Sequence, residues 1–262
     1  MARKWTKNEE KENHAELRRL YVTQNKSIRE ISLILNIAQQ TVFQRLVRLG
    51  IQTNPSLKKN YLKKRSDVRL PNKYSGNLAE FFGVMLGDGH VSHFQVTVTL
   101  GNKEMDYAKY VQALVSRIFN APAKISIRSS GYTVVYLGST LATSWLFKGG
   151  LVSNKVKSQI GVPQWIFYQK VFMRRFLRGF FDTDGSVYKI RHGIQISFTN
   201  YSLPLLEGLQ NLLSILGYIP SEVSSHKIYL TKRKDIKRFF KEINPKNQKH
   251  QKRFNNIYAS VG

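Results

Sequence analysis

The sequence predicts an α+β protein in which two similar halves follow a small all-α domain. Two apolar runs, Phe81 to Gly89 and Leu177 to Gly185, each contain a glycine and end in Asp-Gly. Asp184 lies 96 residues after Asp88 (184 − 88), about the length of one small domain, so a duplicated unit is the simplest interpretation. Three short amphipathic segments before the first run predict the all-α domain.

The amino-terminal domain is predicted over residues 1–52. Residues 1–14 are charged and are expected to fray, so the first helix is expected from Ala15. Ser27 and Glu30 have the spacing of a capping box that opens a second helix. A third helix is predicted from Gln39 to Leu49, with Gly50 as its cap and a buried side formed by Val42, Phe43, Leu46 and Leu49.

These three helices resemble a helix-turn-helix DNA-binding module. The third would be the recognition helix, because its exposed glutamine and arginine side chains can read adenine and guanine edges: Gln39, Gln40, Gln44 and Arg45. Small helical modules that bind nothing have the same pattern, so that alternative stays open. Residues 53–74 form a basic connector, either a solvated linker or a segment that tracks phosphates.

The first half is predicted over residues 75–163 and the second over residues 164–262. The first is expected to have a helix at 77–86, a strand at 90–99, a helix at 103–119, strands at 124–128 and 132–137, and a helix at 139–147. The second is expected to have a helix at 170–181, strands at 187–191 and 193–199, a helix at 203–216, strands at 222–225 and 227–230, and a helix at 234–243. We interpret each half as αββαββα.

The repeated run predicts two closely packed helices that end in paired carboxylates. Gly83 and Gly179 would let the helices approach, and Gly89 and Gly185 are expected to stop them in the left-handed conformation. Two adjacent carboxylates repel each other unless a cation lies between them. Ligation by oxygen atoms alone suits Mg²⁺, so Asp88 and Asp184 are the predicted metal ligands.

Both runs resemble the signature motif of the LAGLIDADG homing endonucleases, and Leu177 to Gly185 is the closer match. The resemblance implies a monomeric, magnesium-dependent hydrolase that cuts both strands of a long DNA site, with Mn²⁺ able to substitute, and it implies a role in intron homing. It adds the backbone carbonyls of Gly87 and Thr183 to the metal site. It also implies a polar and a basic residue beside the metal-bound water in each half. The polar candidates are Asn102 and Asn200, and the basic candidates are Lys124 or Arg128 and Lys227 or His226.

Composition independently predicts a nucleic-acid partner. Lys and Arg number 42 against 16 Asp and Glu, for a net charge of +26, and 42% of residues are hydrophobic, as expected for a folded basic globule. The absence of cysteine excludes disulfides and thiol catalysis. No apolar run is long enough to cross a bilayer and no secretory signal is recognisable. The expected location is therefore intracellular, either cytoplasmic or organellar.

Alternating strands predict the DNA-binding face, which would form a saddle in the major groove. Neutral polar side chains suit base edges, and basic ones suit phosphates. The candidates are His93, Gln95, Thr97, Thr99, Arg128, Tyr132, Lys189, Arg191, Gln195, Ser197 and Thr199.

Two alternatives keep the same fold without DNA cleavage: a transcriptional regulator that binds DNA, and an intron RNA maturase. The retention of Asp88 and Asp184 favours the nuclease. An intein is disfavoured because the chain begins with Met1, lacks cysteine and does not end in His-Asn, which predicts a free-standing protein.

Overall fold

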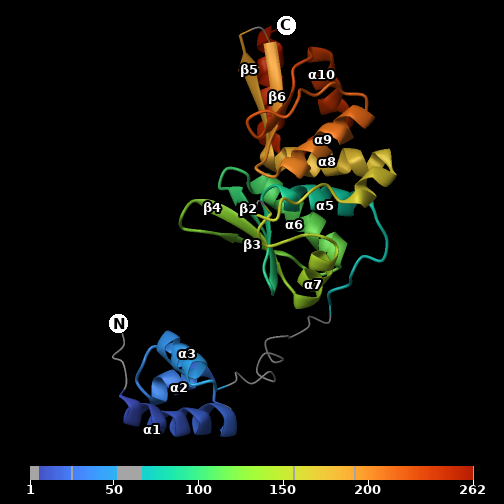
Figure 1. Ribbon diagram of the computed structural model, residues 1–262. Helices are drawn as coiled ribbons and strands as arrows, with labels where there is room; N and C mark the ends of the chain where they lie inside the picture. Colours follow the sequence, from blue (N-terminus) through green and yellow to red (C-terminus); the bar gives the residue numbers. More distant parts are fainter. Residues whose placement is uncertain (1–5, 25, 52–66, 156, 192, 262) are drawn as a thin grey trace. The chain divides into compact units, whose positions relative to one another are not determined.

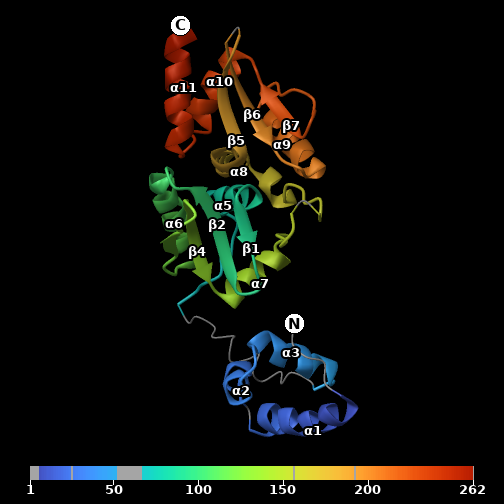
Figure 2. The same ribbon diagram turned by 90° about the vertical axis from the view of Figure 1, so that its left-hand side faces the viewer.

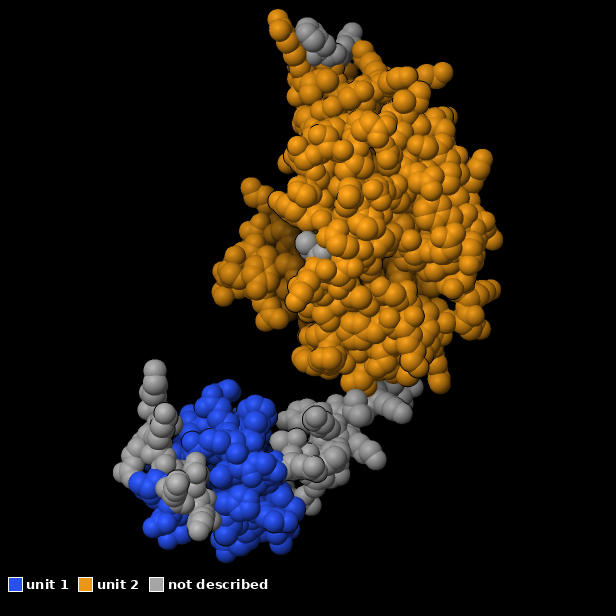
Figure 3. All heavy atoms as spheres, in the orientation of Figure 1, with its two compact units in different colours: residues 1–63 blue, residues 64–262 orange. Residues whose placement is uncertain are grey.

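A computed structural model describes residues 6–24, 26–51, 67–155, 157–191 and 193–261. The chain divides into two compact units, residues 1–63 and 64–262, which Figure 3 shows in separate colours. Residues 53–66 of the predicted connector lie outside the described residues.

The first unit is entirely helical in its described part. It contains α1 (Lys7–Arg18), a π-helical turn η1 (Arg19–Thr23), α2 (Ile28–Ile34) and α3 (Gln39–Arg48) (Figure 1). The predicted capping box opens α2, since the Ser27 N–H donates to Glu30 Oε2 at 2.7 Å and the Glu30 N–H donates to Ser27 Oγ at 3.2 Å. The helices enclose a core of their own, formed by Leu17, Leu20, Tyr21, Ile31, Val42, Leu46 and Ile51.

Two expectations for this unit are wrong. The first helix begins at Lys7 rather than Ala15, because Thr6 and Glu9 form a second capping box: the Thr6 N–H donates to Glu9 Oε2 at 2.7 Å. Phe43 does not join the core and is 43% exposed, because the buried side of α3 is a narrow stripe through Val42 and Leu46.

The second unit consists of two halves that meet along α5 (Gly76–Leu86) and α8 (Lys170–Asp184), which lie side by side in Figures 1 and 2. The first half adds β1 (Gly89–Val91), β2 (Gln95–Gly101), α6 (Met105–Phe119), β3 (Lys124–Ile127), β4 (Tyr132–Gly138) and α7 (Thr140–Lys148). Its antiparallel sheet has the order β1-β2-β4-β3. The single strand predicted at 90–99 is in fact a hairpin with its turn at 92–94, so Phe94 is 63% exposed instead of buried.

A short 3₁₀ helix, η2 (Gln164–Tyr168), leads into the second half. This half continues from α8 with β5 (Gly185–Ile190), β6 (Gly193–Thr199), α9 (Leu203–Ile215), β7 (Lys227–Leu230), α10 (Arg233–Glu242) and α11 (Gln248–Val261). Its antiparallel sheet has the order β5-β6-β7. The α+β fold class is therefore confirmed.

The second half departs from the prediction at two places. The strand predicted at 222–225 is absent as a ladder, because Ser225 and His226 adopt left-handed backbone angles and leave only one isolated bridge, between Ser224 and Lys227. The unpredicted α11 lies along β5 (Figure 2) and stacks its Phe254 on Phe240 at 4.0 Å between ring centroids.

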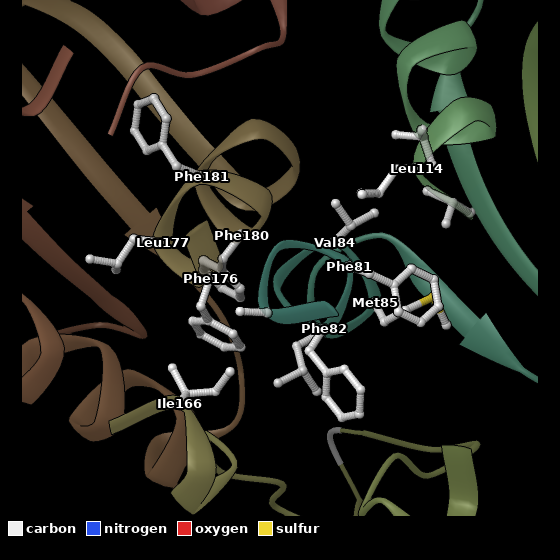
Figure 4. Close-up of a cluster of buried hydrophobic side chains, with 14 of the residues drawn as sticks. Phe81, Phe82, Val84, Met85, Leu114, Ile166, Phe176, Leu177, Phe180 and Phe181 are labelled. Atoms are coloured by element: carbon white, nitrogen blue, oxygen red, sulfur yellow. The ribbon is translucent and has the colours of Figure 1, made fainter. Parts of the chain in front are cut away.

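Glycines bring the two halves together, as the sequence predicts. A Cβ added at Gly83 would lie 2.2 Å from the Phe176 carbonyl oxygen, and one added at Gly179 would lie 2.1 Å from the backbone carbonyl oxygen of Glu80. Figure 4 shows Phe176 and Phe180 on the side of α8 toward α5, while Leu177 and Phe181 point into the second half. One continuous core therefore runs through both halves.

A buried charge network also crosses this helix pair. Glu80 of α5 is fully buried and pairs with Arg175 Nε of α8 at 2.8 Å and with Arg178 Nη1 at 3.6 Å. The Tyr110 hydroxyl of α6 donates to the other carboxylate oxygen of Glu80. These partners fix how far α5 can slide along α8, which sets the relative position of the two motif ends. No helix in the described ranges is long and apolar enough to cross a membrane.

Candidate active site

The two motif aspartates lie at the ends of the paired helices. Asp88 follows α5 in the turn before β1, and Asp184 is the last residue of α8. The helix ends are in contact: a Cβ added at Gly87 would lie 1.9 Å from Thr183 Oγ1 and 3.5 Å from Asp184 Cγ. The fold therefore brings the carboxylates of both halves to one place.

The glycines after the aspartates do not act as left-handed caps, which corrects the sequence prediction. Gly185 has φ −85° and ψ 158°, and it begins β5. Space is the reason for glycine here, since an added Cβ would lie 2.3 Å from the Phe181 carbonyl oxygen at Gly185 and 2.4 Å from Met85 Cα at Gly89. Each glycine lets a strand leave directly across the helix end.

Burial makes both carboxylates weak acids for their type. It is the main cause that raises the pKa of Asp184 to about 6, and repulsion from Asp88 raises it further. Burial likewise raises the pKa of Asp88, with a smaller contribution from Glu104. A hydrogen bond from Asn200 Nδ2 to Asp184 Oδ2, 3.0 Å long, opposes the shift at Asp184. The site therefore holds more negative charge than its burial favours, which is the condition that a bound cation would relieve.

Two lysines approach the carboxylates, and the sequence did not predict either one. Lys155 Nζ donates to the carbonyl oxygens of Met85 at 3.1 Å and Leu86 at 3.2 Å, and also to that of Gly87. Burial lowers the pKa of Lys155, although Asp184 and Asp88 act in the other direction. Lys249, just inside α11, lowers the pKa of both aspartates by its charge.

The two predicted asparagines have different surroundings. Asn200 binds Asp184 directly, whereas Asn102 Nδ2 lies 3.9 Å from the Cβ position of Gly131 in the β3–β4 turn. The pairing of Gly89 with Val98 and of Gly185 with Phe198 makes Leu100, two residues before Asn102, the counterpart of Asn200 in the strand. Since Leu100 is buried, the first half has no matching amide at that position.

An acidic residue takes a neighbouring place in the first half. Glu104, immediately before α6, accepts from the Gly101 N–H at 2.9 Å and pairs with Lys249 Nζ at 2.8 Å. Burial acts to raise its pKa, but hydrogen bonds from Lys249 and Asn247 outweigh burial and lower it. Nothing local in the sequence connects Glu104 to Lys249, so no sequence pattern points to this residue.

Asp182 is a further missed residue, although it lies within the second motif. It is fully buried, and its carboxylate accepts from the backbone N–H groups of Lys246 and Asn247 at 2.8 to 3.0 Å. Burial raises its pKa to about 7, against the effect of those two hydrogen bonds. Asp182 therefore anchors the segment that carries Lys249, and the doubled Asp in the motif was the available signal.

The remaining predicted catalytic residues lie on the sheets. Lys124 is exposed at the start of β3, where it pairs with Tyr136, and Lys227 starts β7 opposite Thr199, next to Asn200. Among the described residues, neither lysine makes a hydrogen bond or ion pair with an aspartate of the site. The Gly87 carbonyl is engaged by Lys155, while the Thr183 hydroxyl donates to the Phe180 carbonyl at 2.9 Å.

The predicted DNA-binding residues divide by strand register. Gln95, Thr97 and Thr99 of β2 lie on the open face, opposite the buried Val96 and Val98. Gln195 and Thr199 of β6 likewise lie on the open face of their sheet. Ser197 lies on the same face but is buried, with only 3% of its surface exposed. Lys189 pairs with Ile194, so register places it on the helix-covered side. Three candidates lie outside the strands: His93 in the β1–β2 turn, Arg128 in the β3–β4 turn and Arg191 in the β5–β6 turn. Tyr132 is the first residue of β4 and is exposed.

In the first unit, the predicted reading residues lie on α3. Gln39, Gln40 and Gln44 are exposed, and Arg45 is half-buried. A DNA-binding role for this helix stays a prediction.

The donor set at the motif ends fits a hard divalent cation. Two carboxylates and nearby backbone carbonyls offer only oxygen ligands, and Mg²⁺ needs few of these because it keeps several waters. Within the part of the chain that the structure describes, no group of three or more His, Cys, Asp or Glu side chains could hold a metal. Asp88 and Asp184 are the two carboxylates that the motif ends bring together.

Residues 171–244 match the sequence family described as LAGLIDADG-like domain. This part of the chain is therefore similar to LAGLIDADG-like domains. The match covers α8 through α10, so it includes the second aspartate and its sheet. The first half repeats its motif and its helix pairing without being part of that match.

Two curated relatives come from Methanocaldococcus jannaschii. Replication factor C small subunit is 30% identical over 125 residues, which are 47% of this chain and 7% of that protein. The probable translation initiation factor IF-2 is 26% identical over 201 residues, which are 74% of this chain and 16% of that protein. The chain thus spans only a small part of the length of either relative.

Similar solved structures include proteins of the LAGLIDADG type. The N-terminal LAGLIDADG domain of DUF199/WhiA has a TM-score of 0.47 at 16% identity, over 64% of this chain and 80% of that chain. Mesophilic variants of the homing endonuclease I-DmoI give 0.44 at 16% identity, over 64% and 94%. The homing endonuclease I-WcaI, bound to its DNA recognition sequence, gives 0.45 at 17% identity, over 77% and 95%.

Proposed function

We propose that this protein is a monomeric, metal-dependent endonuclease. It cuts both strands of double-stranded DNA at a specific long site, and each of its two halves contributes to the cleavage. The observation that carries the proposal is the meeting of Asp88 and Asp184 at the ends of α5 and α8, each half supplying one carboxylate. Hydrolysis of a phosphodiester needs on the order of 20 kcal/mol of barrier reduction, which buried paired carboxylates without a cation do not provide.

A divalent cation, Mg²⁺ or Mn²⁺, would supply an activated water and stabilise charge on the departing oxygen when bound. Asp88 and Asp184 would hold it, and their raised pKa values support this role because a cation offsets the charge that burial disfavours. Lys155 and Lys249, whose charges act on both aspartates, would balance charge on the phosphate and orient the attacking water.

The substrate class is supported by charge and by shape. The net charge of +26 favours a polyanion, and polar side chains line the open faces of both sheets. Because the polar sets of β2 and β6 differ, the two halves would read different base sequences. A long asymmetric target follows from that difference, as homing of an intron or a free-standing gene would require.

The test is a selection for cleaved sequences from a random DNA library in Mg²⁺ and in Mn²⁺. Asp88→Asn and Asp184→Asn should each abolish the double-strand cut, because amides are neutral and bind Mg²⁺ weakly. Glu207→Gln is the control, since Glu207 is exposed on α9. A double-strand cut that persists in either motif variant would remove that carboxylate from the mechanism.

The second candidate is a DNA-binding regulator that does not cleave. It is favoured by the small ligand set, since the described residues offer two paired carboxylates and no larger cluster. Site-specific binding without nicking in either metal would establish it. Preferential binding of folded intron RNA would instead indicate a maturase.

A further inference from the structure

The two lysines near the aspartates are held in different ways. Lys155 is fixed by carbonyl oxygens at the end of α5, within its own half of the unit. Lys249 is fixed by a carboxylate of the other half, with 2.8 Å between its Nζ and Glu104 Oε1. Only one of the two positions therefore depends on an ion pair that crosses between the halves.

Glu104 is itself held rigidly. Its Oε2 accepts from the Gly101 N–H at 2.9 Å, and its Oε1 accepts from Asn247 Nδ2 at 2.6 Å as well as from Lys249. Asn247 Nδ2 also donates to the Asp182 carbonyl at 2.9 Å, so the chain of contacts returns to α8. These donors hold the Glu104 carboxylate in one position. Little further side-chain entropy is therefore lost when Lys249 pairs with it.

The lysines also differ in which aspartate they affect more. Of the two, Lys249 has the larger effect on the pKa of Asp88, whereas Lys155 has the larger effect on that of Asp184. The backbone also connects Glu104 to the segment of Asp88: the Thr99 N–H of β2 donates to the Asp88 carbonyl oxygen at 3.3 Å, and the Gly101 N–H, two residues further along β2, donates to Glu104. A change confined to Lys249 should therefore be felt mainly at Asp88.

We propose that Glu104 is a positioning residue that holds Lys249 in place, so that the site of Asp88 depends on Glu104 more strongly than the site of Asp184 does. This inference rests on the proposed nuclease function. It means that the two strands of one target are cut by unequal sites, one of which can be weakened more than the other. Asp182 of α8 accepts from the Asn247 N–H, and the Asn247 side chain in turn donates to Glu104.

The first test is strand-resolved cleavage by Glu104→Gln, with each strand of the selected target labelled separately. Glutamine keeps the size and the acceptor oxygen of the side chain but removes its charge. We expect one strand to be cut about tenfold more slowly or worse, which is typical of losing a charge-assisted hydrogen bond, with less than threefold change on the other. The slowed strand should be the one that Asp88→Asn protects. Glu207→Gln, an exposed glutamate on α9, is the matched control and should leave both strands unchanged.

A second test needs neither metal nor DNA. Lysine acetylation followed by mass spectrometry reports how freely each amine reacts, with the exposed Lys124 as the reference. In Glu104→Gln, Lys249 should become several-fold more reactive while Lys155 keeps its rate. Glu104→Asp keeps the charge on a shorter side chain and should give an intermediate rate. A merely structural defect would change both lysines and would appear as a lower melting temperature.

Equal slowing of the two strands, or unchanged Lys249 reactivity in Glu104→Gln, would overturn the proposal. If the wild-type protein cuts no DNA in either metal, the nuclease function fails instead. The acetylation result then still decides whether Glu104 holds Lys249.

Discussion

Closing the space between α5 and α8 is the sharpest perturbation that the structure offers. Gly83→Ala places a methyl group 2.2 Å from the Phe176 carbonyl oxygen, and Gly179→Ala places one 2.1 Å from the backbone carbonyl oxygen of Glu80. A carbon and an oxygen normally lie about 3.2 Å or more apart, so the helices must separate by about 1 Å. The obstructing atoms belong to the backbone, so no side-chain rotation can relieve the clash.

The cost follows from two opposing effects. Overpacking typically costs about 1–3 kcal/mol, and a rigid backbone contact puts this site at the upper end. Replacing Gly by Ala inside a helix returns about 1 kcal/mol of helix propensity. We therefore expect each variant to lose about 2 kcal/mol of unfolding free energy. For a unit of this size, that is a drop of roughly 4–8 °C in melting temperature.

Thermal unfolding followed by circular dichroism measures the loss, with Gly138→Ala as the matched control. An added Cβ at Gly138 meets nothing within 4 Å, so that variant should stay within about 0.5 kcal/mol of wild type. The double variant should lose less than the two singles combined, because the first methyl already separates the helices. Full additivity, or a Gly83→Ala protein that melts with the wild type, would refute the close approach.

Three further predictions concern the buried charges. Mn²⁺ affinity, measured by calorimetry, should fall about tenfold for each pH unit below about 6, because Asp184 must lose a proton to bind the ion; constant affinity from pH 5 to 7 would contradict this. Asp182 has its pKa raised to about 7 in the folded protein, so its contribution to stability is complete below about pH 4 and is lost as the pH rises through 7. Between these two pH values, the unfolding free energy of the wild type should fall by about 1.4 kcal/mol per pH unit because of this residue. Asp182→Asn should remove that fall, as measured by urea unfolding. Glu80→Ala leaves Arg175 and Arg178 without their buried partner and should cost about 3 kcal/mol in the same melts, a loss that Glu207→Ala should not show.

Local patterns account for the parts of the fold that the sequence predicts correctly. The glycines of the two runs predict the close helix pair, and the alternation of Val96 and Val98 with polar residues predicts the faces of β2. The three helices of the first unit follow from periodicity and from the Ser27 cap. Each of these features depends on residues within one or two turns of each other, which is the range over which sequence patterns carry information.

Lengths and long-range partners escape the same reasoning. Nothing local distinguishes a single strand at 90–99 from a hairpin with its turn at 92–94. The strand register likewise could not be predicted, and it makes Leu100, not Asn102, the counterpart of Asn200. Lys155 lies 68 residues from the Gly87 carbonyl that it contacts. In a chain with 42 basic residues, no spacing identifies the two lysines that the fold brings to the carboxylates.

The two halves differ at one buried motif position, where Leu86 in the first run corresponds to Asp182 in the second. A leucine side chain cannot accept from a backbone N–H, whereas Asp182 accepts from the N–H groups of Lys246 and Asn247. These bonds fix the start of the segment whose Lys249 pairs with Glu104. Lys155 comes from a different segment and donates to carbonyl oxygens at the end of α5. The leucine-to-aspartate difference between the duplicated copies therefore accounts for the anchoring of Lys249, which has no counterpart at Leu86.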